Sequence, residues 1–338
     1  MFRNLAQSLL TNSKTQFPLK KRLQNPDLSW TRGDRSPIVS VATQLRKFAL
    51  AVGCLGICFA IPLWKLVRFA VDSELYSYIL LVPFISIYLL WLKRRSLPVS
   101  TVPARGLAVV FLSAGAALLV AYWLWLRSSL LLVPDEYLMM MTLCFLLLFC
   151  GISSLFWGTA TLRAVAFPLS FLALLAPVPP AAVQKMDSFL QWGSAQVASG
   201  LFSLSGTSYL QDGLAFQLPD VKLGIAPECS GIHSTVVLFI TALLLSYIFL
   251  RTPGKRAFLI LFVIPLGLLR NGFRVYVIGQ LCIHLGPQMI DSPIHRKGGP
   301  IFFVLSLIPL FIMLLLLQRS EKTTSGQIPN VQDQPCAN

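Results

Sequence analysis

Long apolar runs separated by short polar segments are the main feature of this 338-residue sequence. A bilayer core of about 30 Å is crossed by about 20 mostly apolar residues in an α-helix, because a helix satisfies its own backbone polar groups. The pattern predicts eight such helices, over residues 48–64, 75–92, 106–126, 137–157, 162–179, 231–250, 257–281 and 300–317. The predicted fold class is therefore an all-α integral membrane protein, a polytopic bundle of about eight transmembrane helices.

The segment from Pro180 to Cys229 is too polar and too broken to cross a bilayer. Its first part nevertheless has apolar residues at near-helical spacing, namely Val183, Met186, Leu190, Val197, Leu201 and Leu204. This spacing predicts a short amphipathic helix over 183–204 that lies at the membrane interface. Residues 214–226 form a strand-like segment that leads to the sixth span.

Composition and charge agree with a membrane protein. Hydrophobic residues make up 55% of the chain and charged residues 12%, and the mean hydropathy is +0.71. A net charge of +15 could suggest a nucleic-acid partner, but the basic residues are scattered among short loops without the stacking aromatics that a single-strand groove needs. We therefore expect membrane lipid, and no nucleic acid, around this protein.

The distribution of Lys and Arg predicts the topology. With the N-terminus in the cytoplasm, the inner segments hold nineteen of these residues and the outer segments seven. Positively charged loops stay on the cytoplasmic side. We therefore expect a multi-pass protein of the plasma (inner) membrane with both termini in the cytoplasm. Three regions follow: a basic, disordered cytoplasmic leader (1–47), the membrane domain (48–317) and a polar cytoplasmic tail (318–338).

Apart from Arg163 at the edge of the fifth predicted span, Arg270 and Arg274 are the basic side chains that lie within predicted spans. A cation in the bilayer costs several kcal/mol unless it faces a cavity or a partner, so such residues indicate a functional site. The two arginines are four residues apart and share one helix face, with Asn271 beside the first. Arg274 is expected in the outer third of the seventh span.

Cys229 lies just before the sixth span, in the sequence Pro227-Glu228-Cys229-Ser230-Gly231. Its thiol is expected at the outer N-terminus of a helix, where free amide groups and the helix dipole favour a thiolate. Glu228 would oppose this effect unless it faces water or an arginine. A cysteine that only occupies a tight turn is the competing interpretation.

A thiol nucleophile needs a base, and the sequence has three histidines, His233, His284 and His295. All three are expected on the outer side, together with Cys229. His233 follows Cys229 by four residues and His295 precedes the last span by five, so either can supply the base. A hydrogen-bonded interfacial histidine without chemistry is the alternative for each.

Cysteine with histidine is the arrangement for acyl transfer through a thioester, and an arginine can stabilise the oxyanion on the attacked carbonyl. The sequence contains no phosphate-binding loop, no metal-binding cluster and no dinucleotide motif, so neither a cofactor nor a metal is predicted.

These residues resemble the exosortase/archaeosortase family of membrane-embedded cysteine transpeptidases. The resemblance rests on Glu228-Cys229-Ser230-Gly231-Ile232, on Asn271 to Arg274 and on His295, and extends to Asp72 to Ser77, Leu81-Val82-Pro83, Tyr88-Leu89-Leu90-Trp91, Phe167-Pro168-Leu169 and Pro177-Val178-Pro179. These pieces occur in the same order as in the family and together extend over roughly residues 50–317. One departure is Tyr76-Ser77-Tyr78-Ile79, which stands where the family commonly has a Tyr-Ser-His-Gly type of sequence.

The resemblance implies that Cys229 is the nucleophile, Arg274 the family's arginine and His295 the general acid/base. Glu228, Ser230, His233, Arg270 and Asn271 are the expected supporting or substrate-binding residues. The implied substrates are exported proteins whose C-terminal sorting signal combines a short motif such as Pro-Glu-Pro, one transmembrane helix and a basic cluster. The enzyme would cut near the motif and pass the protein to an amine acceptor.

Two other functions fit part of the sequence. A transporter or a scaffold for envelope polysaccharide export would use Arg270 and Arg274 as pathway charges, but it predicts paired broken helices and internal repeats. A non-catalytic receptor for substrate helices would keep the spans and tolerate loss of the Cys229 thiol.

Overall fold

The computed structural model describes residues 36–98, 103–127, 134–219, 221–225, 230–286, 288 and 299–325. The chain divides into two compact units, Met1–Ala51 and Val52–Asn338. In the first unit, residues 36–51 form the beginning of helix α2 (Ser36–Cys58), which starts inside the segment predicted as a leader. The other elements belong to the second unit.

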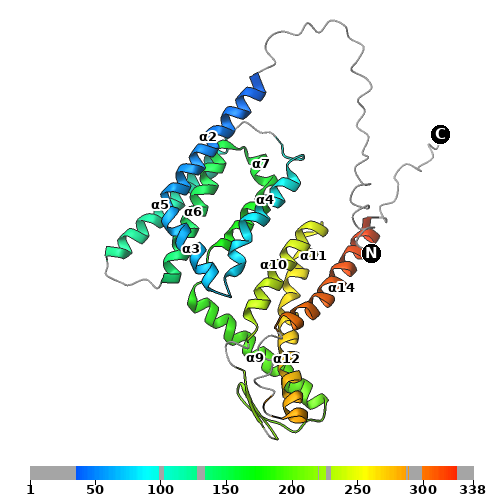
Figure 1. The fold of residues 1–338 in the computed structure, drawn as a ribbon. Coiled ribbons are helices and arrows are strands. Elements are labelled where there is room, and N and C mark those ends of the chain that lie inside the picture. Colours follow the sequence, from blue (N-terminus) through cyan, green and yellow to red (C-terminus); the bar gives the residue numbers. More distant parts are fainter. Residues whose placement is uncertain are drawn as a thin grey trace, which may run out of the picture. The chain divides into compact units, whose positions relative to one another are not determined.

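The described part of the chain has five helical segments long and apolar enough to cross a bilayer. They are α5 (Arg105–Arg127), α6 (Pro134–Phe156), α10 (Ile232–Phe249), α11 with α12 (Pro253–Leu261 and Val263–Leu285) and α14 (Gly299–Ser325) (Figure 1). Helix α14 continues into the segment predicted as a tail. The all-α polytopic membrane fold is confirmed.

Two bent helix pairs also pass the same test, which raises the number of candidate spans to seven. Helix α2 meets α3 (Ala60–Asp72) at 70°, with the break at Phe59. The segment Ala166–Leu175 meets α9 (Pro180–Leu204) at 93°, and this bend contains Pro177 and Pro179, which cannot continue a regular helix.

The predicted number of eight spans exceeds these five to seven for identifiable reasons. The predicted fifth span, 162–179, is divided among α7 (Thr159–Ala164), α8 (Ala166–Phe171) and the 3₁₀ turn η2 (Leu172–Leu175). The predicted second span is a shorter apolar segment, η1 (Ser77–Leu80) followed by α4 (Val82–Lys93). Hydropathy alone does not reveal such breaks.

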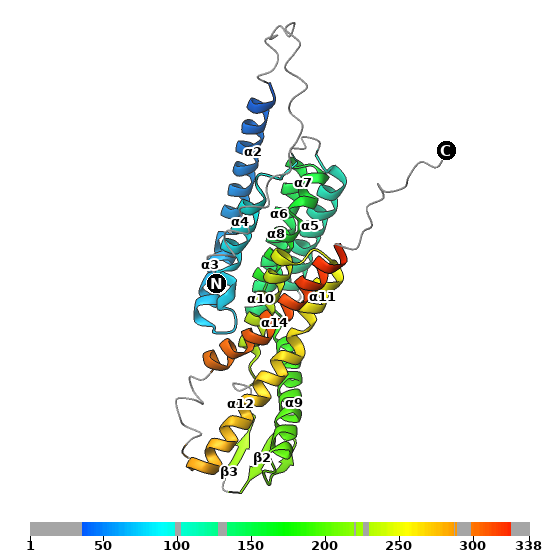
Figure 2. The same ribbon diagram turned by 90° about the vertical axis from the view of Figure 1, so that its right-hand side faces the viewer.

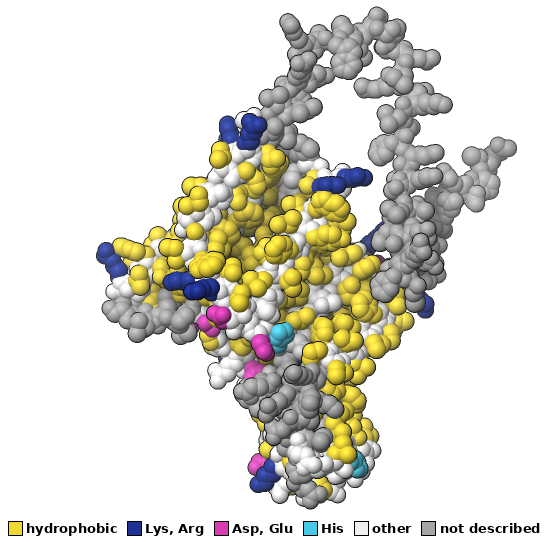
Figure 3. Space-filling view, in the orientation of Figure 1, with side chains coloured by type: hydrophobic (Ala, Val, Ile, Leu, Met, Phe, Trp, Pro, Cys, Tyr) yellow, Lys and Arg dark blue, Asp and Glu magenta, His cyan; other side chains and the backbone are white. Residues whose placement is uncertain are grey.

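Large apolar side chains point outward from many of these helices. Exposed fractions reach 78% for Ile57, 71% for Phe84 and 66% for Ile301. On the face shown in Figure 3, hydrophobic side chains cover most of the helical surface. Such a surface is unfavourable in water and suits acyl chains, so it supports a membrane-embedded chain.

Helix packing in the second unit forms several hydrophobic cores. Helices α5 and α6 pack along each other, and α12 packs along α9 (Figure 2).

The Tyr76 hydroxyl donates a 2.9 Å hydrogen bond to the Val178 carbonyl, so two of the segments that carry the family resemblance are in contact.

The predicted strand-like segment is a small antiparallel sheet. Its strands β1 (Leu210–Asp212), β2 (Ala215–Leu218) and β3 (Val221–Gly224) pair in the order β1-β2-β3, with Phe216 opposite Leu223. Phe216 and Leu223 are buried against Phe202 of α9 and Val275 of α12. The sheet is thereby fixed to the α9–α12 pair.

Helix α9 contains the predicted amphipathic stretch 183–204 and extends it by three residues at its start. Its buried face carries small and polar residues such as Gly193, Ser194 and Ala198, whereas Met186 and Leu204 of the predicted apolar stripe are exposed. Leu190 of the same stripe and Phe202 are buried together with the small residues, so the observed buried face matches the predicted stripe only in part.

Candidate active site

The predicted site residues fall into two groups. Cys229, Glu228 and His295 lie outside the residues that the structure describes. The described members are Ser230 before α10, His233 in the first turn of α10, and Arg270, Asn271 and Arg274 on α12. The structure therefore defines the surroundings of the two residues that directly follow Cys229.

Gly231 forms the turn between Ser230 and α10. Its φ of +74° lies in the left-handed region, where a side chain would be strained. The Ile232 amide donates a hydrogen bond of 3.4 Å to Ser230 Oγ, and Ser230 is buried. As in any α-helix, the first amide groups of α10 have no carbonyl partner within the helix.

Arg270 holds this turn from the neighbouring helix. Its Nη2 donates hydrogen bonds to the Gly231 carbonyl (2.9 Å) and to Thr235 Oγ1 (3.1 Å). The Thr235 hydroxyl in turn donates to the Gly231 carbonyl at 2.9 Å. Since only 7% of Arg270 is exposed, these are charge-assisted bonds in a largely desolvated place.

Asn271 extends the polar cluster to a third helix. Its Nδ2 donates a 3.1 Å hydrogen bond to Ser194 Oγ on α9, and both residues are buried. A Cβ atom at Gly231 would lie 2.8 Å from Arg270 Nη2 and 2.9 Å from Asn271 Oδ1. The turn after Cys229 thus fits against the adjacent polar side chains of α12.

Arg274 and the described histidines occupy separate positions. Arg274 lies one helical turn beyond Arg270 and is half-buried. His233 is half-buried at the start of α10. His284 is exposed in the last turn of α12, about 21 Å along the helix from Arg270, so it is remote from the Gly231 turn.

The sequence interpretation missed Ser194 and Thr235. Ser194 lies in a run of small residues, Gly193-Ser194-Ala195, and such a run on a membrane helix indicates close contact with another helix. Thr235 follows Gly231 by four residues, the spacing at which a Thr hydroxyl reaches back to a helical carbonyl. Both patterns can be read in the sequence, but they identify site residues only when the partner helix is known.

Among the residues that the structure describes, no group of three or more His, Cys, Asp or Glu is arranged to hold a metal ion. The polar cluster instead consists of two hydroxyl groups, one amide and one buried cation. The buried cation favours negative charge on a nearby bound or reacting atom.

Comparison with known proteins adds one match. The sequence model of a family described as transmembrane exosortase matches residues 64–312, well over half of the chain. The chain belongs to the transmembrane exosortase family. The matched exosortase region contains the Gly231 turn, both α12 arginines and the segments of Cys229 and His295. No curated protein and no solved structure matches the chain.

Proposed function

We propose that this exosortase is a membrane thiol protease and transpeptidase that cleaves C-terminal sorting signals of the Pro-Glu-Pro-containing type from exported proteins. The observation that carries the proposal is the buried Arg270 that holds the Gly231 turn, because this turn directly follows Cys229 and Ser230. A desolvated arginine held at a backbone carbonyl is costly unless the site uses it.

In the proposed reaction, the Cys229 thiolate attacks the carbonyl carbon of the scissile peptide bond. His295 gives a proton to the amine that leaves, and the exported protein stays on Cys229 as a thioester. An acceptor amine or water then attacks the thioester, loses its proton to the histidine and releases the thiolate. No metal or cofactor takes part.

Arg274 is proposed to donate hydrogen bonds to the oxyanion that forms in both steps. Arg270, Asn271 and Ser230 support the nucleophile turn, and Glu228 and His233 belong to its surroundings. The substrate reaches the site as a helix in the bilayer, which explains a protease with lipid-exposed helices. We place both termini in the cytoplasm and the active site toward the outer face of the plasma membrane. This topology needs an even number of spans and counts the shorter apolar segment Ser77–Lys93 as the eighth, beside the seven candidate spans.

The test is maturation of a co-expressed exported protein that carries such a sorting signal. Cys229→Ala and Cys229→Ser are expected to abolish processing, since neither side chain replaces a thiolate. Cys58→Ser is the matched control, because Cys58 is a free, exposed cysteine remote in sequence from the turn. Normal processing by the Cys229 variants would refute the proposed activity.

The same assay distinguishes the two candidate bases. His295→Ala is expected to lower processing at least about 100-fold, the usual contribution of general acid–base catalysis. His233→Ala is expected to retain most of the activity. Loss of processing only in the His233 variant would transfer the role of base to His233.

A further inference from the structure

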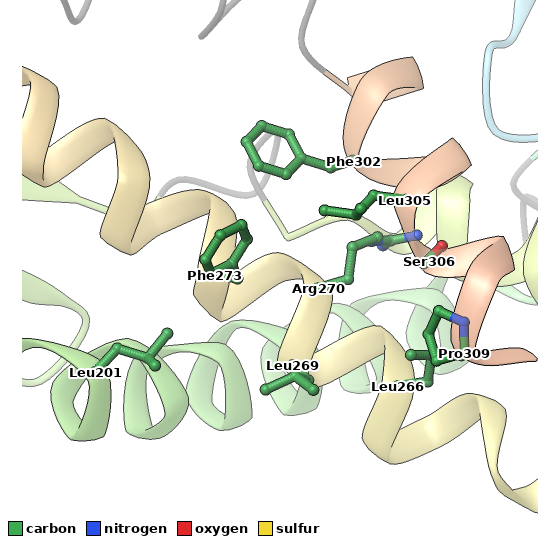
Figure 4. Close-up of a pocket in the computed structure, with 9 residues that line it drawn as sticks. All are labelled: Leu201, Leu266, Leu269, Arg270, Phe273, Phe302, Leu305, Ser306 and Pro309. Atoms are coloured by element: carbon green, nitrogen blue, oxygen red, sulfur yellow. The ribbon is translucent and has the colours of Figure 1, made fainter. Parts of the chain in front are cut away.

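The pocket shown in Figure 4 lies between α9, α12 and α14 and has a volume of about 230 Å³. Its wall presents almost only apolar surface, from residues such as Leu266, Phe273 and Phe302. A wall of this kind does not compensate the desolvation of a charged ligand. Charged side chains gather instead at the opposite end of α10, around Tyr247.

Two cations approach the ring of Tyr247 from neighbouring helices. Lys93 Nζ, at the end of α4, lies 5.1 Å from the ring centroid, and Arg256 Cζ, on α11, lies 5.5 Å from it. Phe167 of α8 stacks on the same ring at a centroid distance of 3.7 Å, with 4° between the ring planes. The ring therefore joins four helices and holds two positive charges close together.

Both cations have more hydrogen-bond donors than the described part of the chain has acceptors for them. Lys93 Nζ donates to the Ala164 carbonyl at 3.0 Å, and Arg256 Nε donates to the Leu250 carbonyl at 2.8 Å. The amine has three donors and the guanidinium five, so most of them are available to a ligand. Both side chains are half-buried rather than enclosed, which leaves them reachable from outside.

The positive charge at this end of the helices is not balanced by the chain. Residues 93–95, 163 and 251–256 include seven Lys or Arg, whereas Glu321 is the described acid at this end. Its carboxylate accepts hydrogen bonds from two backbone amides at the start of α11. The residues outside the description at the two ends of the sequence, 1–35 and 326–338, together hold seven Lys or Arg and three Asp, so they do not reverse the balance. The compensating anions therefore come from the surroundings.

The same end of α4 has the features of a membrane–water interface. Arg94 lies over the ring of the exposed Trp91, with Cζ 4.6 Å from the centroid. Tryptophan and basic residues at a helix end are typical of the headgroup level. Leu90, one turn before Lys93, and Ile248, next to Tyr247, are exposed apolar side chains. A phospholipid offers both a phosphate to the cations and acyl chains to this apolar surface.

We propose that Lys93 and Arg256 bind the phosphate of an anionic phospholipid, in the leaflet that we assign to the cytoplasm. The guanidinium fork and the compact amine both form charge-assisted hydrogen bonds with phosphate oxygens, and basic sites between membrane helices on the cytoplasmic side bind such headgroups. The bound headgroup links α4 to α11 across Tyr247. Tyr247 lies sixteen residues after Gly231, about 24 Å along α10, so the lipid site is independent of the proposed chemistry.

Lipid binding can be measured on the full-length protein in detergent. The protein is titrated with phosphatidylglycerol or with phosphatidylcholine of the same acyl chains, and native mass spectrometry counts the bound lipids. We expect phosphatidylglycerol to reach half-saturation at an about tenfold lower concentration, because its headgroup keeps a net negative charge beside two cations. Equal binding of both lipids would overturn the anionic site.

Paired variants locate the site. Lys93→Gln combined with Arg256→Gln is expected to abolish the preference for phosphatidylglycerol, whereas Lys93→Arg combined with Arg256→Lys keeps both charges and most of the preference. The matched control is Arg94→Gln combined with Arg95→Gln, which removes the same charge from exposed side chains next to Lys93 and should keep the preference. Loss of the preference in the control, or its persistence without Lys93 and Arg256, would refute the site.

Binding of phosphatidylcholine, which depends less on the cations, shows that each variant is folded. Arg256→Gln alone leaves Lys93 and its hydrogen bond in place and is expected to lower the preference about threefold. An unchanged preference in this folded single variant would contradict the role of Arg256.

Inorganic phosphate distinguishes a lipid from a free anion. Added at the concentration of the lipid, it is expected to leave phosphatidylglycerol bound, because the acyl chains bury additional apolar surface. Displacement of the lipid by an equal concentration of inorganic phosphate would show a site for a free anion and overturn the lipid assignment.

Discussion

Gly231 has an unusual backbone conformation and lies in close contact with the polar side chains of α12. Its φ is +74°, and Arg270 Nη2 and Asn271 Oδ1 lie within 3 Å of the position that a Cβ atom would take. A larger residue must therefore change the backbone or displace both side chains. This position decides whether the turn after Cys229 keeps its geometry.

We predict that Gly231→Ala destabilises the protein by at least about 1 kcal/mol, the cost of a left-handed backbone for alanine. It should also abolish processing, because Arg270 loses its place on the turn. Thermal unfolding in detergent and the processing assay measure both effects. Gly200→Ala is the control, since nothing lies within 4 Å of its Cβ position and the helix gains up to about 1 kcal/mol. A fully active Gly231→Ala protein would contradict the described geometry.

At the scale of residues, the sequence pointed to the part of the candidate site that is contiguous or unusual. A cation in an apolar run is rare, which made Arg270 and Arg274 visible. Ser194 and Thr235 could not be identified as site residues from the sequence. Serine and threonine are common in membrane helices, and their role depends on the residues that they contact. The proximity of Arg270 to Gly231 joins residues 39 positions apart, a distance that no local pattern specifies.

At the scale of elements, α9 and α12 form the support of the site. Their close approach depends on Gly272, where a Cβ atom would lie 2.5 Å from Val197 Cγ1 and 2.9 Å from the Ser194 carbonyl. Absence of a side chain at this point allows Asn271 to reach Ser194 across the interface. Small residues serve the same purpose in other membrane helix pairs.

Gly272→Ala is predicted to cost about 1–3 kcal/mol through overpacking and to weaken the Asn271–Ser194 hydrogen bond. Thermal unfolding should show the loss, and a second substitution, Val197→Ala, should recover part of it by removing the closest methyl group. If Gly272→Ala unfolds at the wild-type temperature, the helices do not approach as closely as described.

Element boundaries were predicted where sequence and packing agree. The runs at 106–126, 137–157 and 231–250 correspond to α5, α6 and α10 within a few residues. The run at 162–179 failed as one helix because proline and tertiary packing divide it. The amphipathic pattern of α9 predicted a helix, but its buried face matches the predicted stripe only in part, because Leu190 is buried whereas Met186 and Leu204 are exposed.

At the scale of the whole molecule, the proposed topology places the sheet outside and both termini inside. The turn between β1 and β2 at Gly213 is exposed and tolerates an insertion better than a helix does. The argument for this orientation is the excess of Lys and Arg in the segments assigned to the cytoplasm.

We predict that an epitope inserted after Gly213 is accessible to antibody on spheroplasts, whereas an epitope fused after Asn338 is accessible only after permeabilisation. Retained processing activity shows that each tagged protein is folded. The opposite pattern would invert the topology and place the proposed active site in the cytoplasm.

The most direct test of the central claim is mass spectrometry of the enzyme during turnover. A substrate with a poor acceptor, quenched in acid, should leave the N-terminal part of the exported protein on the peptide that contains Cys229, as a thioester that hydroxylamine removes. Cleavage of the substrate without any adduct, or with an adduct on another cysteine, would contradict a Cys229 acyl-enzyme.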